Sequence, residues 1–390
     1  MNTSALNPLA HLANSTPHNP QGAAPHPGAS TPAEGNRGKR INIVATWRCA
    51  CFCFQRLLGA IMKKNTFPRP SLFIALSLAM TLAACGGGGG GSTSAASTTG
   101  ASSTPNGGTL SSPQYASGSA QLAAFNQLNT MRQQCGFPAL SENTLLDQAA
   151  GNHMTYMQDN VYVGHNETQG SPGYTGATPQ ARATAAGYSG EAAEENAGHA
   201  TDVGGALSVI GLASVPYHEA GLFIPSLTDF GATYSTVVMG PTTTYYVPEI
   251  MSGFQGTAGT YSGMPMTFPC QGTTGVDFES AANGENPTPT INGAVVSFPI
   301  GTPIALEGNM SDTIVLSSGQ LTAPGGSVIN LDLLDSATDS NHEMQPYESA
   351  AFPASPLQPN TTYSATITGT INGTPFSRNF SFTTGSQGQF

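Results

Sequence analysis

An uncharged apolar stretch lies well inside this chain and limits which of its parts can fold together. The stretch covers residues 71–84 and follows a basic segment that contains Met62, Lys63, Lys64 and Arg69. Its 14 residues match the apolar part of a secretory signal peptide and fall short of the roughly 20 residues that span a bilayer. We therefore expect a signal peptide at 62–84 and a folded, exported part that begins after it.

The end of this stretch resembles the lipobox of bacterial lipoproteins. It reads Leu-Ala-Ala-Cys at 82–85, and six glycines follow. In lipoproteins the cysteine is acylated and becomes the mature N-terminus. The resemblance therefore implies a lipid anchor on Cys85, with 85–118 as the lipidated cysteine and its Gly/Ser-rich tether. A glycine after the cysteine usually accompanies sorting to the outer membrane, which implies the cell envelope of a Gram-negative bacterium. The alternative is an ordinary cleaved signal with an incidental cysteine.

Residues 1–61 precede this signal and need a separate explanation. They are polar and rich in proline up to Arg40, and a short stretch then contains Cys49, Cys51 and Cys53. Because a signal peptide begins near its own initiator, we expect Met62 to be the true start and 1–61 to be a mis-assigned or disordered extension. The spacing of the three cysteines fits no standard zinc pattern, so a metal or redox site is the weaker alternative.

The basic residues are distributed very unevenly along the chain. The sequence has 11 Lys and Arg against 22 Asp and Glu, but only Arg132, Arg182 and Arg378 lie beyond Cys85. Since Glu34 is the only acid before Cys85, the exported part has 21 acids and a net charge of −18. Such a chain lacks the clustered cations that bind nucleic acid or anionic lipid, so a membrane link would depend on Cys85.

The region 119–272 mixes helical and extended patterns. Helical spacing or helix-capping residues occur at 122–131, from 141–143 onward, at 178–187 and at 201–210, and extended stretches follow at 230–238 and 243–250. Helices followed by strands predict an α+β fold. Cys135 and Cys270 are the cysteines that remain after Cys85, and in an oxidising compartment we expect them to form a disulfide, with free thiols as the alternative.

Several short patterns in this region occur in a fixed order. They are Leu128, Asn129 and Arg132; Leu146, Ala149, Ala150, His153, Tyr156 and Met157; Gly164, His165 and Asn166; Ala186, Gly187 and Tyr188; Glu195 and Asn196; and Tyr217 and His218. The series resembles the bacterial branch of the CAP superfamily, also called SCP or PR-1-like. The resemblance implies an α-β-α sandwich over 119–272, with a central cleft that holds two histidines and one or two glutamates.

Three residues match the cleft positions of that family, namely His165, Glu195 and His218. The sequence also departs from the family pattern, because Glu194 replaces the glycine before Glu195, and Glu219 follows His218 where an arginine is common. The second family glutamate has no clear counterpart, and Glu194 and Glu219 are both candidates for it.

Two neutral imidazoles and a carboxylate can hold zinc or another divalent metal and leave a position open, with His165 and His218 as the metal ligands. A structural hydrogen-bond network is the alternative. His153 lies on an apolar helical stripe and is expected in the core, and Arg182 is expected to be structural. His199 is expected in a solvent-exposed loop, with a place in the lining of the cleft as the alternative.

The region 286–386 is rich in Thr, Ser, Val and Ile, with turn residues at 324–326 and 371–373. It is expected to be all-β and resembles the Ig-like β-sandwich modules of bacterial surface proteins. Its acidic cluster does not have the spacing of an EF-hand, so a solvated loop is expected rather than a calcium site. The cluster consists of Asp332, Asp335, Asp339 and Glu343.

Three functions stay open at this point. We expect a cell-envelope lipoprotein whose cleft binds an unidentified envelope ligand, with or without a divalent metal. The alternatives are a metal-dependent hydrolase of peptides or envelope polymers, and a structural or adhesion protein of the surface.

Overall fold

Side chains cap three of the five helices within residues 107–386, and the other two begin without a side-chain cap. A computed structural model describes residues 107–386. The helices are α1 (Ala120–Gln134), α2 (Thr144–Asn160), α3 (Pro179–Ala185), α4 (Gly204–Leu212) and α5 (Pro216–Phe223). Ser119, Asn143 and Thr178 cap α1, α2 and α3 by accepting backbone hydrogen bonds, which confirms the predicted starts of α2 and α3. The sequence did not predict α5. The anchor at Cys85, the signal at 62–84, residues 1–61 and most of the tether lie outside the described residues.

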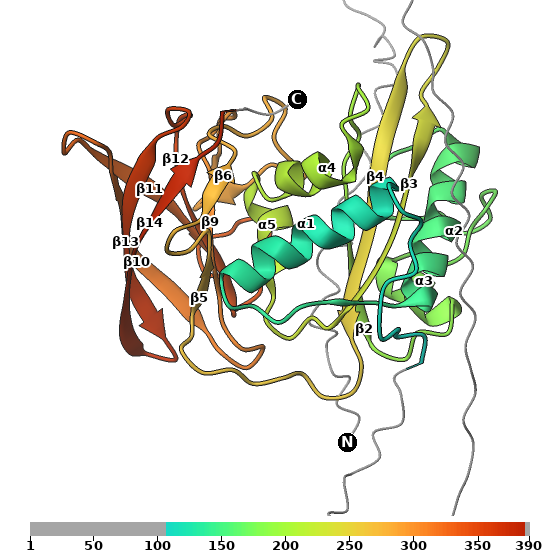
Figure 1. Cartoon of the computed structure of the whole chain (residues 1–390), viewed down its shortest axis with the longest axis horizontal. Helices are drawn as coiled ribbons and strands as arrows, with labels where there is room; N and C mark the ends of the chain where they lie inside the picture. Colours follow the sequence, from blue (N-terminus) through green and yellow to red (C-terminus); the bar gives the residue numbers. More distant parts are fainter. Residues whose placement is uncertain (1–106, 387–390) are drawn as a thin grey trace, which may run out of the picture. The chain divides into compact units, whose positions relative to one another are not determined.

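A four-stranded sheet forms the middle layer of the first region, in the order β1-β3-β4-β2. Its strands are β1 (Ser141–Glu142), β2 (Glu191–Asn196), β3 (Asp229–Val238) and β4 (Thr244–Phe254). Helices α2 and α3 pack on one face, and α1 and α4 lie on the other (Figure 1).

The two faces of this sheet bury separate apolar cores. Phe230 and Ile250 pack with residues of α1 and α4, whereas Met251 packs with residues of α2 and α3. Because neighbouring strand residues point to opposite faces, one strand serves both cores. Gly205 of α4 allows close helix contact, since a Cβ there would lie 1.8 Å from a backbone oxygen of α1. The result is an α-β-α arrangement.

The C-terminal region consists mainly of one eight-stranded sheet, in the order β5-β9-β12-β11-β10-β13-β14-β6. Its strands are β5 (Met266–Phe268), β6 (Thr274–Val276), β9 (Ile304–Glu307), β10 (Ile314–Thr322), β11 (Val328–Asp335), β12 (Glu348–Pro353), β13 (Thr362–Ile371) and β14 (Thr374–Thr384). Two short strands, β7 (Thr290–Ile291) and β8 (Ala294–Val295), form a separate pair.

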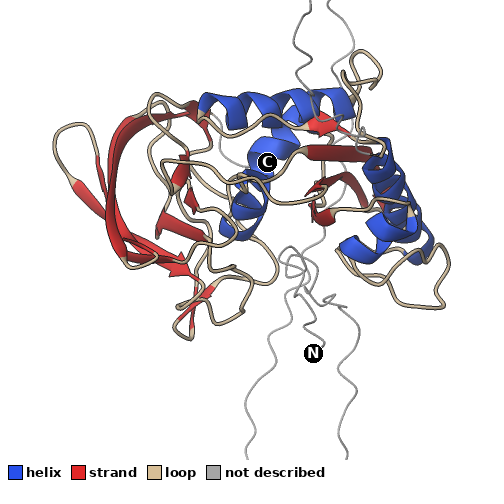
Figure 2. Ribbon diagram, turned by 90° about the horizontal axis from the view of Figure 1, so that it is seen from below, coloured by secondary structure: helices blue, strands red, loops and turns tan. Residues whose placement is uncertain are grey.

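The strands of the large sheet curve around a shared core (Figure 2) that includes Leu306, Ile367 and Phe382. The predicted hairpin is present, because Asn372 and Gly373 join β13 to β14 with positive φ angles of 52° and 76°. The region is rich in strands, as expected, while its assignment as an Ig-like sandwich stays a prediction.

Helix α5 lies between the two sheets and contacts β2, β9 and β12. Its Phe223 stacks on Phe268 of β5, with ring centroids 4.0 Å apart. The expected disulfide between Cys135 and Cys270 is present and joins the end of α1 to the segment between β5 and β6. A membrane-spanning helix, long and apolar enough to cross a bilayer, does not occur within residues 107–386.

Candidate functional site

A pocket opens where α5 meets the loops of the C-terminal region. Its lining residues are His165, Glu195, Tyr217, His218, Glu285, Asn286, Pro287 and Glu343. The structure therefore brings together the three cleft residues expected from the sequence. Half of the lining lies beyond residue 272, outside the region in which the cleft was predicted.

His218 and Glu195 form a close pair in this pocket. Glu195 lies on β2 and His218 in the first turn of α5, and His218 Nδ1 is within hydrogen-bonding distance of Glu195 Oε2. Burial lowers the pKa of His218, and the carboxylate of Glu285 partly opposes this shift. The contact holds the imidazole in one orientation and leaves Nε2 on the far side of the ring.

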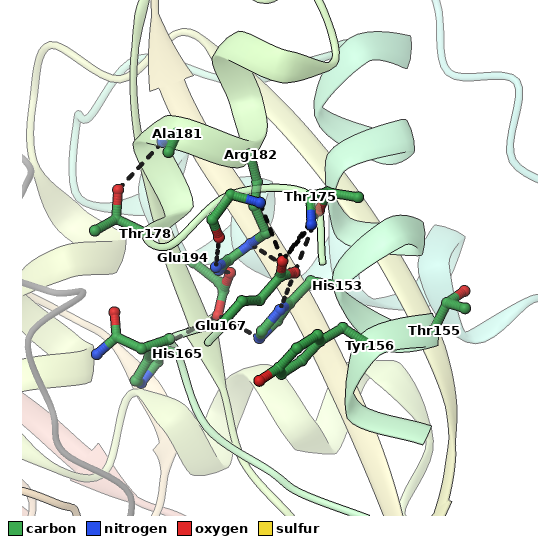
Figure 3. Close-up of polar contacts among 12 residues, drawn as sticks. His153, Thr155, Tyr156, His165, Glu167, Thr175, Thr178, Ala181, Arg182 and Glu194 are labelled. Carbon is green, nitrogen blue, oxygen red and sulfur yellow. Dashed lines mark hydrogen bonds and ion pairs between the residues drawn. The ribbon is translucent and has the colours of Figure 1, made fainter. Parts of the chain in front are cut away.

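His165 is oriented by the other glutamate of the same strand. Its Nδ1 atom lies 3.1 Å from Oε1 of Glu194 (Figure 3). Because successive strand residues point to opposite faces, Glu194 and Glu195 reach different histidines. The rings of His165 and His218 lie 6.0 Å apart between centroids. Each ring thus has a carboxylate at Nδ1 and keeps Nε2 for another partner, which is the usual arrangement of metal-binding histidines.

A buried charge network supports this wall of the pocket. Arg182 Nη2 donates to Glu194 Oε2, and His153 has Glu167 Oε1 2.9 Å from Nδ1 and the Gly164 carbonyl oxygen 2.7 Å from Nε2 (Figure 3). Burial opposes the ionisation of Glu194, but Arg182 and His153 hold the pKa of its carboxyl well below its usual range. Both ring nitrogens of His153 are thus engaged by neighbouring oxygens, which fixes the orientation of the ring. The guanidinium of Arg182 faces the carboxylates of Glu194 and Glu167, which stabilises the network.

His153 also belongs to a buried group that has the spacing of a metal site. Donor atoms of His153, Glu194 and Glu249 lie within 4.8 Å of one another. The hydrogen bonds fit a metal poorly, because both nitrogens of His153 are engaged and the guanidinium of Arg182 already pairs with Glu194. Burial, and then the charge of Glu194, raise the pKa of Glu249 well above its usual range. The raised pKa favours the neutral form of the Glu249 carboxyl, which is the weaker metal ligand.

Two further candidates lie away from the pocket lining. Glu219 is fully buried on α5, and burial and then the nearby Glu285 raise the pKa of its carboxyl well above the usual range. His199 is partly exposed and exchanges two backbone hydrogen bonds with Tyr246 of β4. Of the two candidates for the second family glutamate, Glu194 contacts a cleft histidine, whereas Glu219 does not line the pocket.

Sequence reasoning missed Glu167 and Glu285. Glu167 follows His165 by two positions, so its location near the cleft could have been predicted from the sequence. Glu285 is 67 residues from His218 along the chain, and no local pattern links the two. Only the packing of the C-terminal region on α5 brings Glu285 into the pocket.

Comparison with known proteins identifies one part of the chain. Residues 125–232 match the model of the CAP family, the cysteine-rich secretory protein family. An outer surface protein from Borrelia burgdorferi is 14% identical, with a TM-score of 0.28 over 34% of this chain and 90% of that one. An extracellular protein containing an SCP domain from Bacillus anthracis str. Ames is 21% identical, also with a TM-score of 0.28. That similarity covers 35% of this chain and 40% of the Bacillus protein. No curated protein matches the chain.

The matched segment contains His165, Glu195 and His218, whereas Glu285 and Glu343 lie outside it. The two structural similarities are too low to support a conclusion about function. Residues 125–232 are therefore a CAP domain, and a large, sheet-rich region follows it.

Proposed function

We propose that the pocket binds a ligand and holds a divalent metal, with His165 and His218 as the metal ligands. The observation that carries the proposal is the pair of imidazoles in one pocket, each with a carboxylate at Nδ1. A lowered pKa of His218 supports it as well, because neutral imidazole is the form that binds metal. Glu195 serves as the carboxylate that orients His218.

Water or the ligand would occupy the remaining metal positions. Within residues 107–386, no third His, Cys, Asp or Glu side chain completes a set with His165 and His218 in which all donor atoms lie within 4.8 Å of one another. An open coordination sphere is typical of metals that bind or activate a ligand, whereas structural zinc sites use four protein ligands.

Calorimetric titration of the full chain with Zn²⁺ tests the proposal. We expect one ion per chain, and a loss of at least about tenfold in affinity in His165→Ala and in His218→Ala. His342→Asn is the matched control, because His342 is exposed and Asn tolerates its positive φ of 61°. Absence of stoichiometric binding, or equal titration in both histidine variants, would contradict the metal site.

A hydrolase is the second candidate, because the pocket contains a carboxyl that titrates near neutral pH beside a histidine. Burial raises the pKa of Glu285 to about 7 and lowers that of His218, as suits general acid–base chemistry. We expect hydrolysis of peptides or envelope polymers to be abolished in Glu195→Gln while the circular dichroism spectrum stays unchanged. Turnover retained in that variant would exclude a hydrolase of this design.

We further propose that the protein is anchored in the cell envelope through an acylated Cys85, in the outer membrane. The lipobox-like sequence at 82–85 supports this location. Metabolic labelling with palmitate is expected to mark the native protein and to leave Cys85→Ser unlabelled. Mass spectrometry of the native N-terminus tests the start at Met62 as well, because peptides from 1–61 would rule it out.

A further inference from the structure

The helix that carries His218 begins without a cap of its own. The residue before α5 is Val215, whose side chain accepts no hydrogen bond, and Pro216 occupies the first helical position. The N–H groups of Tyr217 and His218 therefore need acceptors from elsewhere, because the first turn of a helix leaves its N–H groups unpaired.

Glu285 of the C-terminal region supplies these acceptors. Both of its carboxylate oxygens accept from the Tyr217 N–H, at 3.0 and 3.1 Å, and Oε2 also accepts from the His218 N–H at 3.2 Å. Glu285 is buried, with 7% of its surface exposed. A buried carboxylate at a helix N-terminus stabilises that end of the helix and fixes its place.

A second loop of the C-terminal region is attached to the same helix. The Tyr217 hydroxyl donates to Asp339 Oδ1 at 2.6 Å, and Asp339 Oδ2 accepts from the Glu343 N–H at 2.7 Å. These bonds place Glu343 in the lining of the pocket. Asp339 and Glu343, which were expected in a solvated acidic loop, are instead both buried.

The wall from the C-terminal region makes the pocket strongly acidic. Glu195, Glu285 and Glu343 contribute three carboxyl groups, against two imidazoles and no arginine or lysine in the lining. A partly buried cavity of this composition favours a cation, because its carboxyl groups outnumber its imidazoles and neither lysine nor arginine lines it.

We propose that the pocket is a composite cation site, built by residues of both regions. The C-terminal region then contributes to binding and is not a separate spacer. Glu285 is a positioning residue that sets the place of His218, and Glu343 provides negative charge that attracts the bound cation. This inference rests on the proposed metal at His165 and His218 for the role of Glu343, whereas the role of Glu285 can be measured without metal.

Ring ¹⁵N chemical shifts of the histidines in the metal-free full chain test the role of Glu285. Glu285→Gln keeps an oxygen acceptor for α5, and Glu285→Ala removes it. We expect the signature of a His218 Nδ1 bonded to a carboxylate to persist in the Gln variant and to disappear in the Ala variant. The His165 signals, set by Glu194, are expected to stay unchanged in both and to show that the fold is intact. An unchanged His218 in Glu285→Ala overturns the positioning role.

Zn²⁺ titration of Glu343→Gln tests the composite wall, and this variant keeps the cap on α5. We expect about a tenfold loss of affinity relative to the wild-type chain. Glu279→Gln is the matched control, because it removes the same charge from a partly exposed residue outside the pocket lining. If Glu343→Gln and Glu279→Gln bind Zn²⁺ equally well, while binding still requires His165 and His218, the role of Glu343 is refuted and the metal site is not. Absence of Zn²⁺ binding in the wild-type chain refutes the proposed metal itself.

Discussion

The stability of the protein is expected to depend on pH through Glu285. Burial raises the pKa of its carboxyl from 4.5 to about 7, although His218 and the N–H groups of α5 oppose the rise. One pKa unit corresponds to about 1.4 kcal/mol, so the shift is worth about 3 kcal/mol. Because the folded-state pKa is the higher one, the unfolded chain loses its proton first. The stability that the protonated Glu285 carboxyl contributes is complete below the unfolded-state pKa. It falls as pH rises from about 4.5 and is lost above about 7.

Urea unfolding of the wild-type chain and of Glu285→Gln at about pH 4 to 8 measures this effect. The glutamine has no proton to lose, so the free energy of unfolding of the variant, relative to wild type, is expected to rise by about 3 kcal/mol over this range. Glu279→Gln is the control, since Glu279 is partly exposed, and its difference from wild type is expected to stay flat. A difference for Glu285→Gln that does not vary with pH would refute the burial of this carboxyl against α5.

Three further changes test the framework around the pocket. Replacing Cys135 and Cys270 by serine removes a cross-link between residues 135 positions apart. Equilibrium unfolding is expected to show that the free energy of unfolding falls by up to about 5 kcal/mol, and an unchanged value would mean that the disulfide does not form. Arg182→Met leaves the buried carboxylate of Glu194 without its guanidinium partner. In the same assay we expect the free energy of unfolding to fall by about 3–5 kcal/mol, and a near-neutral result would contradict the ion pair. Gly205→Ala places a Cβ against the backbone of α1 and is expected to lower the thermal midpoint by an amount equivalent to about 1–3 kcal/mol, whereas an unchanged midpoint would show that the two helices can separate.

Local features of the fold were predictable because local hydrogen bonds produce them. Asn143 and Thr178 cap helices from the adjacent position, and the turn at Asn372 and Gly373 needs only two residues with positive φ. Helix α5 was not predictable in this way, because its cap is Glu285 and comes from another region.

The candidate site shows the same division. The ordered patterns of the sequence pointed to His165, Glu195 and His218, and the structure places all three in one pocket. The sequence left the partner of His165 open, because Glu194 and Glu195 are adjacent and only the faces of β2 decide which histidine each one reaches.

The sequence by itself therefore determined the resemblance to CAP proteins, the acidity of the chain beyond Cys85 and the types of side chain in the cleft. Only the tertiary structure decided that the C-terminal region completes the pocket with Glu285 and Glu343. The physical reason is distance along the chain. Contacts between residues more than sixty positions apart depend on how whole sheets pack around α5. The sequence next to each contacting residue therefore does not predict its partner.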